Sequence, residues 1–300
     1  MDKYGFPYQG SKSKIAFDLL YNIPPADNFY DLFAGGCAIT HAALLSNKWK
    51  NIIANDLQDT PSLFLKAIRG EFKNEKRWIS REDFFRLKDT EPYVRWIWSF
   101  GNNGAGYMFG KEIEQIKKEA HEYLFQNGYD YTPQTRVRLV KQFKEKAKME
   151  GRFELEQLQR LQQLEQLERL EQLERLQQLE QLQRLQQLEQ LERLEVFSKD
   201  YREVKIKPNS VVYCDIPYSQ KENQKEEYYG VSFNKQEFYK WAKTRNFPVY
   251  FSSSFCDEFE CVWQKEKQCN MNNKNSIGKK QIVEKLFWNG VGEHIKQTLF

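Results

Sequence analysis

The stretch Val211-Val212-Tyr213-Cys214-Asp215-Ile216-Pro217-Tyr218 joins an apolar run to a carboxylate, a proline and an aromatic ring. The run Val211–Tyr213 predicts a buried strand that ends near Asp215, because β-branched and aromatic residues suit a pleated, buried surface. Beyond the strand, a carboxylate and a backbone carbonyl can accept two N–H bonds while the ring of Tyr218 stacks on a flat partner. We therefore predict a site that grips a planar base carrying an exocyclic amine.

A glycine turn follows another predicted strand near the start of the chain. Phe29 to Phe33 has the pattern of a short buried strand, Ala34-Gly35-Gly36 comes next, and Ile39 to Leu45 has a helical pattern. This order predicts a mononucleotide-binding unit, in which glycines let the backbone approach a ligand and the helix start offers free N–H groups. The strand Asn51 to Ala54 leads to Asp56, whose spacing suits an acid that holds a ribose diol. An ordinary helix N-cap is the alternative for Asp56.

The composition predicts a soluble protein with one sizeable α/β core and a smaller lobe. The 300 residues are 40% hydrophobic and 15% aromatic. We see neither a leading apolar segment nor a run long enough to span a membrane, so we expect an unexported, cytoplasmic protein without a membrane contact. Its five cysteines form no paired Cys-x-x-Cys set and no histidine completes a zinc pattern, so we expect reduced thiols and no metal.

Leucine occupies every third position from Leu155 to Leu194, and a 24-residue unit that begins at Leu155 begins again at Leu179. Because this spacing would carry the leucines around a helix instead of along one stripe, we predict a short β-solenoid over 153–197, with a long α-helix as the alternative. Nine Glu and five Arg give Leu155–Glu195 a net charge of −4, which leaves +8 for the remainder. The basic remainder suits a polyanion. We expect the repeat to be a spacer, a self-association contact, a protein-docking surface or a tolerated insertion.

Four segments in this order resemble the Dam-like, alpha-class DNA adenine N6-methyltransferases of the phage and prophage type. The segments are Tyr8-Gln9-Gly10-Ser11-Lys12, Asp31 to Cys37, Asn55-Asp56 and Asp215 to Tyr218. Further elements that look like this family are Trp98 to Asn103, Phe251 to Phe255 and Glu284 to Phe287. The resemblance covers most of the chain outside the repeat. It implies an α/β fold with a Rossmann-like sheet that binds S-adenosylmethionine (AdoMet), and a smaller, mostly helical target-recognition lobe that the repeat interrupts.

The resemblance also implies a cofactor set and a catalytic set. The cofactor set is Tyr8, Lys12, Asp31, Ala34, Gly35, Asp56 and Asp215, and the catalytic set is Asp215, Ile216, Pro217 and Tyr218. Tyr8 and Lys12 would contact AdoMet. The next three residues of the cofactor set would line its methionine pocket, and Asp56 would hold its ribose. The substrate would be double-stranded DNA, methylated at adenine N6 after the base is flipped out of the duplex.

Ile216 departs from the family pattern Asp-Pro-Pro-aromatic, in which a proline takes its place. The backbone carbonyl of Ile216 remains available, and Pro217 still favours an extended Ile216, so we expect methyl transfer to be retained but slower. Two alternatives stay open. One is an N4-cytosine DNA methyltransferase, and the other is a catalytically dead DNA-binding or scaffold protein that uses the repeat as its interaction surface.

We expect the AdoMet-binding catalytic domain to comprise residues 1–60 and 203–300, the target-recognition lobe 61–152 and the repeat insert 153–197. Basic residues in the lobe, among them Arg77, Arg81 and Arg86, are candidates for phosphate contact. Asn102 and Asn103 would either bond base edges or shape a turn, and we favour the turn. The three histidines are scattered, and we assign them no chemistry.

Overall fold

The computed structural model describes residues 4–72, 75–126, 133–151, 192–217, 226–228, 231–268 and 281–293. The chain divides into two compact units. The sheet unit contains residues 1–5, 11–65 and 187–300, and the helical unit contains residues 6–10 and 66–186. Most of the leucine repeat lies outside the described residues, so the solenoid and the long helix both stay predictions.

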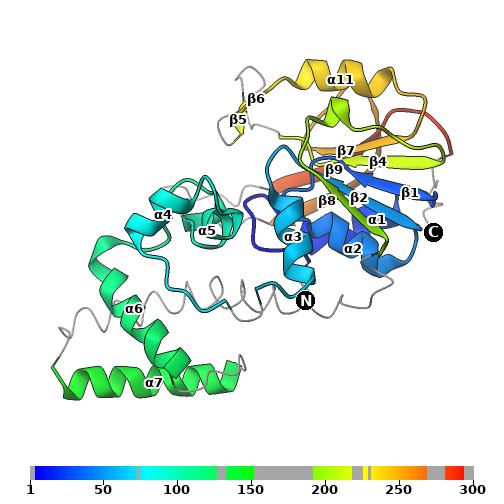
Figure 1. The fold of residues 1–300 in the computed structure, drawn as a ribbon. Helices are drawn as coiled ribbons and strands as arrows, with labels where there is room; N and C mark the ends of the chain where they lie inside the picture. The colour runs from blue at the N-terminus through cyan, green and yellow to red at the C-terminus, as the bar shows by residue number, and fades with distance from the viewer. Residues whose placement is uncertain are drawn as a thin grey trace. The chain divides into compact units, whose positions relative to one another are not determined.

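The sheet unit has a seven-stranded sheet in the order β3-β2-β1-β4-β7-β9-β8 (Figure 1). The strands are β1 (Asn28–Asp31), β2 (Asn51–Asn55), β3 (Leu194–Phe197), β4 (Ser210–Cys214), β7 (Val249–Ser253), β8 (Glu260–Gln268) and β9 (Gln281–Trp288). Neighbouring strands from β3 to β7 are parallel, whereas β9 runs antiparallel to both β7 and β8. The fold is therefore mixed α/β, as predicted, and the strand order reverses between β1 and β4 in the manner of a doubly wound sheet.

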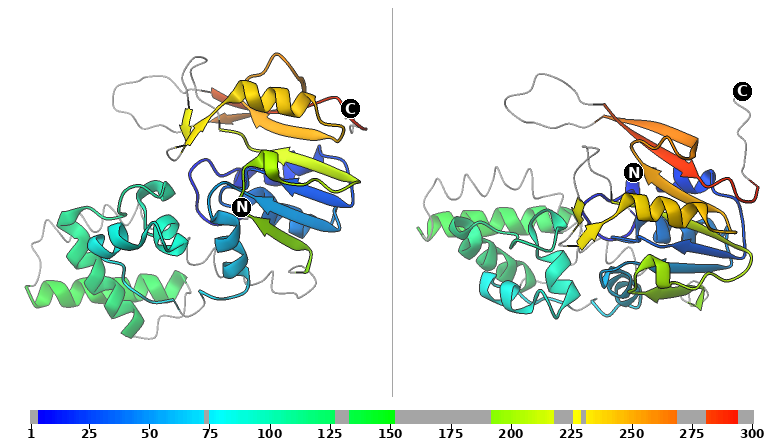
Figure 2. Two further views of the ribbon diagram at one scale, coloured as in Figure 1. Left: turned by 45° about the horizontal axis from the view of Figure 1, so that its top comes forward. Right: turned by 90° about the horizontal axis from the view of Figure 1, so that it is seen from above.

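Helices cover both faces of this sheet (Figures 1 and 2). The helices of the sheet unit are α1 (Ala16–Tyr21), α2 (Ala38–Ser46), α3 (Thr60–Ile68, which runs into the helical unit) and α11 (Lys235–Lys243), with 3-10 turns η1 (Ser13–Ile15) and η3 (Tyr201–Glu203). Tyr30 and Val212 belong to one core cluster with Phe238 of α11. Because side chains alternate along a strand, Asp31 and Asp215 face the opposite side, which α2 covers.

The predicted strands and helices around the glycine turn are confirmed. The strand expected at Phe29 to Phe33 is β1, the strand expected at Asn51 to Ala54 is β2, and the helix expected at Ile39 to Leu45 is α2. The run Val211–Tyr213 forms the middle of β4, and all five residues of that strand are buried. The sequence pattern succeeded here because strands buried on both faces are apolar along their whole length.

The sheet resumes earlier than the expected residue 203, at strand β3. Leu194 is the last leucine of the triplet pattern, yet it is buried and pairs with Ile52 in the parallel register of β2 and β3. Arg193 fixes this point, because its guanidinium donates to the carbonyls of Lys50 and Trp49 and to Asn47 Oδ1. The triplet pattern concealed the strand because Leu194 fits both the leucine spacing of the repeat and a buried position in a strand.

The described part of the helical unit consists of two short helices and two longer ones, with an aromatic cluster among them. They are α4 (Arg81–Leu87), α5 (Pro92–Ile97), α6 (Lys111–Gln126) and α7 (Pro133–Met149), with the 3-10 turn η2 (Phe100–Asn102). Ser80 caps α4 by accepting the Asp83 N–H at 3.1 Å and donating to the Asp83 carboxylate at 2.8 Å. The rings of Trp78 and Phe109 stack at 5.4 Å. Across the described ranges, no helix is both long and apolar enough to cross a membrane.

Candidate active site

Three acidic side chains lie at the carboxyl ends of neighbouring parallel strands. Asp31 ends β1, Asp56 follows β2 and Asp215 follows β4. Strand β1 lies between the other two, with Asp31 opposite Ala54 on one side and Tyr213 on the other. The strand ends at the reversal point of a doubly wound sheet are where such folds bind ligands. The structure thus gathers three residues of the predicted cofactor and catalytic sets at one edge.

The glycine turn is tied directly to this edge. The Cys37 N–H donates to the Ala34 carbonyl at 2.7 Å and closes the turn before α2. Gly35 has a φ of +49°, and its N–H donates to Asp56 Oδ2 at 2.9 Å. The other oxygen of Asp56 accepts the Gln58 N–H at 2.9 Å. Asp56 therefore joins the glycine turn to the end of β2, and burial raises its pKa to about 6.

Asp31 is a buried carboxylate with one oxygen left over. Its Oδ2 accepts the Thr40 N–H at 3.1 Å and the Thr40 hydroxyl at 2.7 Å. Its Oδ1 is buried and has no hydrogen-bond partner among the described residues. Burial raises the pKa of Asp31 to about 7; the charges of Asp215 and Asp56 raise it too, while Thr40 acts in the opposite direction. An orphaned buried oxygen is costly, which makes this position suited to a cationic donor.

Lys12 is held between two carboxylates. Its Nζ lies 2.9 Å from Asp215 Oδ1 and 3.4 Å from Glu284 Oε1. The side chains of Lys12 and Glu284 are buried, at 5% and 4% exposed, whereas that of Asp215 is 20% exposed. Glu284 was not among the predicted site residues, although it falls in a segment that carried the family resemblance. With Asp31 and Asp56, the described residues at this edge include four carboxylates and one lysine.

Ile216 occupies the place of the family's first proline as a core residue. It is 1% exposed and belongs to the cluster that contains Leu32 and Phe251. The side chain therefore anchors the segment after β4 by burial, in place of the ring that would fix φ. Pro217 follows as a partly buried residue, and Tyr218 lies outside the described residues.

An N-terminal segment packs against the glycine turn. The Gly5 N–H donates to His41 Nδ1 at 2.9 Å, and burial lowers the pKa of His41 to about 4, so the ring is neutral at pH 7. A Cβ on Gly5 would lie 2.1 Å from the Gly36 carbonyl oxygen. Sequence reasoning assigned His41 no role, but the ring holds the segment against the turn. Tyr8 belongs to the helical unit, where it packs on Trp96 at 5.1 Å.

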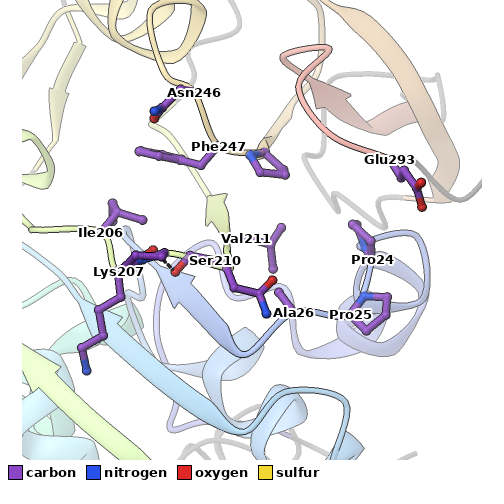
Figure 3. Close-up of a pocket in the computed structure, with 13 residues that line it drawn as sticks. Pro24, Pro25, Ala26, Ile206, Lys207, Ser210, Val211, Asn246, Phe247 and Glu293 are labelled. Atoms are coloured by element: carbon purple, nitrogen blue, oxygen red, sulfur yellow. Dashed lines mark hydrogen bonds between the residues drawn. The ribbon is translucent and has the colours of Figure 1, made fainter.

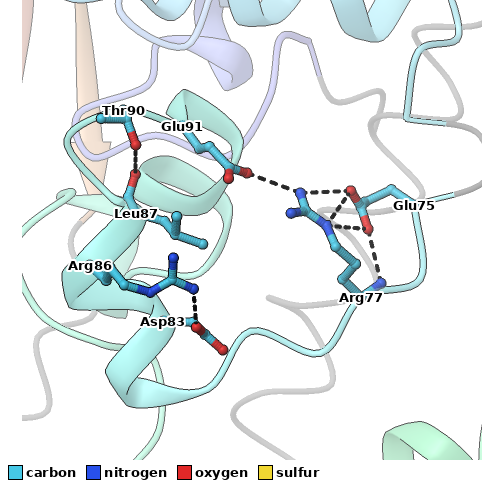
Figure 4. A network of polar contacts seen from close by, with 7 residues as sticks. All are labelled: Glu75, Arg77, Asp83, Arg86, Leu87, Thr90 and Glu91. Carbon is cyan, nitrogen blue, oxygen red and sulfur yellow. Dashed lines mark hydrogen bonds and ion pairs between the residues drawn. The ribbon is translucent and has the colours of Figure 1, made fainter.

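The arginines proposed for phosphate contact are engaged by acids within the helical unit. Arg77 bonds Glu75 and Glu91, and Arg86 pairs with Asp83 (Figure 4). Arg81 Nε lies 3.1 Å from a Glu114 oxygen. Their charges are therefore partly neutralised, which weakens them as phosphate ligands.

The asparagines at 102 and 103 shape a turn, which was the favoured prediction. Asn102 has a φ of +53° and donates through Nδ2 to the Trp96 carbonyl at 3.0 Å. Asn103 Oδ1 accepts the Ala105 N–H at 2.9 Å. These contacts give both side chains local backbone partners.

A cavity of about 520 Å³ opens at the opposite edge of the sheet (Figure 3). Its lining includes Pro25, Asn209 and Pro248, which precede or border the starts of β1, β4 and β7. It contains none of the predicted site residues. Within the described ranges, no three His, Cys, Asp or Glu side chains are grouped to hold a metal ion.

Comparison with known proteins gives a match to a family model in sequence and weak matches among solved structures. The family model described as D12 class N6 adenine-specific DNA methyltransferase matches residues 8–285. No curated protein matches the chain. Among solved structures, the rRNA methyltransferase aviRa from Streptomyces viridochromogenes is similar at a TM-score of 0.37 and 10% identity, over 94% of this chain and 85% of that one. A TM-score this low does not establish that the two proteins share a fold or a function.

Proposed function

The chain belongs to the D12 class of N6 adenine-specific DNA methyltransferases, whose family model spans residues 8–285, and on this premise we propose which of its residues serve the reaction. Asp215 would accept the adenine amine, and the neighbouring edge with Asp31, the glycine turn and Asp56 would hold AdoMet. The observation that carries this assignment is the junction of β1 and β4, where Asp31 with its orphaned oxygen and Asp215 end adjacent strands.

The residues at this edge fit AdoMet. The buried Asp31 Oδ1 has no donor among the described residues, and an ammonium group would supply one. The described charges at this edge, four carboxylates and one lysine, sum to a negative value, which favours a ligand that carries a cationic sulfonium. Asp56 would face the ribose diol while it keeps its bond to the Gly35 N–H. When bound, AdoMet supplies a methyl group attached to a cationic sulfur.

Asp215 and Ile216 supply acceptors for the target amine. The adenine amine is a poor nucleophile because its lone pair is delocalised into the ring. Accepting its two N–H groups at Asp215 and at the Ile216 carbonyl favours a tetrahedral nitrogen with a localised lone pair. The burial of Ile216 fixes that carbonyl in place, so most of the effect comes from positioning. The ring of Tyr218 would stack on the flipped base.

The finer assignments belong to the same proposal. They are the Dam-like phage subtype, double-stranded DNA with its target base flipped, a cytoplasmic location, and a spacer or contact role for residues 153–197. Asymmetry of charge supports DNA, since residues outside the repeat carry +8. Deleting the repeat separates the two roles proposed for it, because a spacer can be shortened with activity retained whereas a contact surface cannot.

The test is transfer of tritium from labelled AdoMet to mixed-sequence duplex DNA, followed by digestion to nucleosides. We expect label in N6-methyladenosine, and loss of at least about 100-fold in the Asp215→Asn variant because the amine loses a charged acceptor. Asp257→Asn is the matched control, since Asp257 is exposed in the loop after β7. It should keep the activity of the parent.

Other products decide between the alternatives. Label in N4-methylcytosine would show that cytosine, and not adenine, is the target base. An absence of label with every DNA tested, despite measurable AdoMet binding, would indicate a dead site. Full activity in Asp215→Asn would overturn the proposed role of that carboxylate.

A further inference from the structure

Glu284 completes a buried three-residue chain that the sequence assignment did not include. It stands on β9, Lys12 precedes the 3-10 turn η1, and Asp215 follows β4. All three belong to the sheet unit. The order of contact is Glu284 to Lys12 at 3.4 Å and Lys12 to Asp215 at 2.9 Å.

The position of Glu284 follows from the antiparallel strand β9. In the register of β7 and β9, Ser252 pairs with Leu286 and Phe251 pairs with Phe287. Phe251 and Phe287 belong to the core cluster under α11, so the alternate residues Leu286 and Glu284 face the other side. That is the side on which Asp215 meets Lys12. Glu284 is 3% exposed, which shields the contact from solvent.

Of the three residues Glu284, Lys12 and Asp215, only Asp215 is partly exposed, so it is the member that can reach a substrate. Asp215 Oδ1, the oxygen nearest Lys12, is fully buried, although the side chain as a whole is 20% exposed. Lys12 therefore fixes the rotation of the carboxylate and leaves its accessible side toward the strand edge. A lysine paired with Asp215 alone would draw charge away from that accessible side, whereas Glu284 shares the lysine and limits this effect.

We propose that Glu284 is a positioning residue for methyl transfer, which holds Lys12 so that the Asp215 carboxylate is both oriented and kept an effective acceptor for the target amine. The inference rests on the proposed role of Asp215. Burying a second carboxylate costs free energy that a simple structural pair would not require. The free-energy cost of burying Glu284 has a reason if the lysine that it shares orients the reacting carboxylate of Asp215.

The experiment compares Glu284→Gln with Glu260→Gln in single-turnover methyl transfer, which separates chemistry from product release. Glu260 is a matched control because it is exposed on the neighbouring strand β8. We expect Glu284→Gln to lower the single-turnover rate by about 10- to 100-fold, since a small misplacement of a reacting group has effects of this size. The dissociation constants for AdoMet and DNA should stay within about 3-fold, because Glu284 is 3% exposed and its charge is shared with Lys12.

The pH profile distinguishes positioning from mere stability. Among the described residues, the ionisable groups around Asp215 are Lys12, Glu284, Asp31 on β1, and Tyr213 and Cys214 on β4. Removing the negative charge of Glu284 strengthens the hold of Lys12 on Asp215, so the acidic limb of the rate profile should move to lower pH. Glu284→Asp keeps the charge and should restore the limb toward that of the parent. An unchanged rate and profile in Glu284→Gln would overturn the inference.

A double-mutant cycle tests the contact without DNA or AdoMet. Glu284→Gln should lower the Tm of the parent by more than it lowers that of a Lys12→Met variant, because only the parent has an ion pair with Lys12 to lose. Equal shifts in both backgrounds would refute the chain of contacts. A parent that transfers no methyl group, with unequal Tm shifts in the two backgrounds, would refute the function while leaving the contact standing.

Discussion

Gly5→Ala should disturb the glycine turn from outside the site. A Cβ at this position would lie 2.1 Å from the Gly36 carbonyl oxygen and 2.7 Å from the Ala38 nitrogen, both backbone atoms that cannot rotate away. The left-handed φ of +70° costs alanine about 1–2 kcal/mol. The segment must also shift by roughly an ångström, which breaks the bond from the Gly5 N–H to buried His41 at a further cost of about 1–3 kcal/mol. We expect a total near 2–5 kcal/mol.

Gly290→Ala is the control for Gly5→Ala, because it has the same backbone strain without the steric contact at the Cβ position. Gly290 has a φ of +78° and open space where a Cβ would stand, so it should lose only about 1–2 kcal/mol. Urea unfolding followed by tryptophan fluorescence gives both values, and AdoMet titration gives the affinity. Gly5→Ala should also weaken AdoMet binding by about 10-fold or more, because the displaced turn carries Gly35. Equal stability loss in the two variants, within about 0.5 kcal/mol, would show that the segment does not press on the turn.

Three further outcomes follow from the site. AdoMet binding near pH 6 should release protons, because Asp31 has a pKa of about 7 in the free protein and a cationic ligand favours its charged form. Calorimetry in two buffers measures the release, and Asp31→Asn should reduce it to the part that Asp56 contributes, whose pKa is about 6. The depressed pKa of His41, about 4 against 6.5, makes its contribution to stability rise with pH across that interval by up to about 3 kcal/mol. Unfolding of His41→Gln and the parent at pH 4.5 and 7 should show the gap widening at the higher pH, whereas a constant gap would contradict the burial argument. Ile216→Ala should cost about 2–4 kcal/mol and slow methyl transfer, with Ile216→Val near 1 kcal/mol; unfolding and single-turnover rates check both, and an Ala variant as stable and active as the parent would remove the anchoring role.

The acids of the site were predictable because strand ends share an edge. Once β1, β2 and β4 are recognised as parallel neighbours, Asp31, Asp56 and Asp215 must meet, whatever their separation in sequence. The local patterns sufficed because each acid follows directly on a buried apolar run.

Glu284 was not predictable in the same way. It stands inside the antiparallel strand β9, where a charged residue normally alternates outward to solvent, and only the insertion of β9 between β7 and β8 brings it to Lys12. His41 was missed for a related reason. A lone histidine on an apolar helix gives no sign that a backbone N–H from Gly5 will meet it.

The three bonds of Arg193 give the chain a fixed register mark within the last leucine triplet. They hold the start of β3 to the loop before β2, and the pairing of Leu194 with Ile52 follows from them. Tandem duplication or loss of whole repeat copies changes the length of chain before this mark but not the identity of the residues at it. A chain with more or fewer repeat copies would therefore enter the catalytic sheet at the same residues and keep the alignment of β3 with β2.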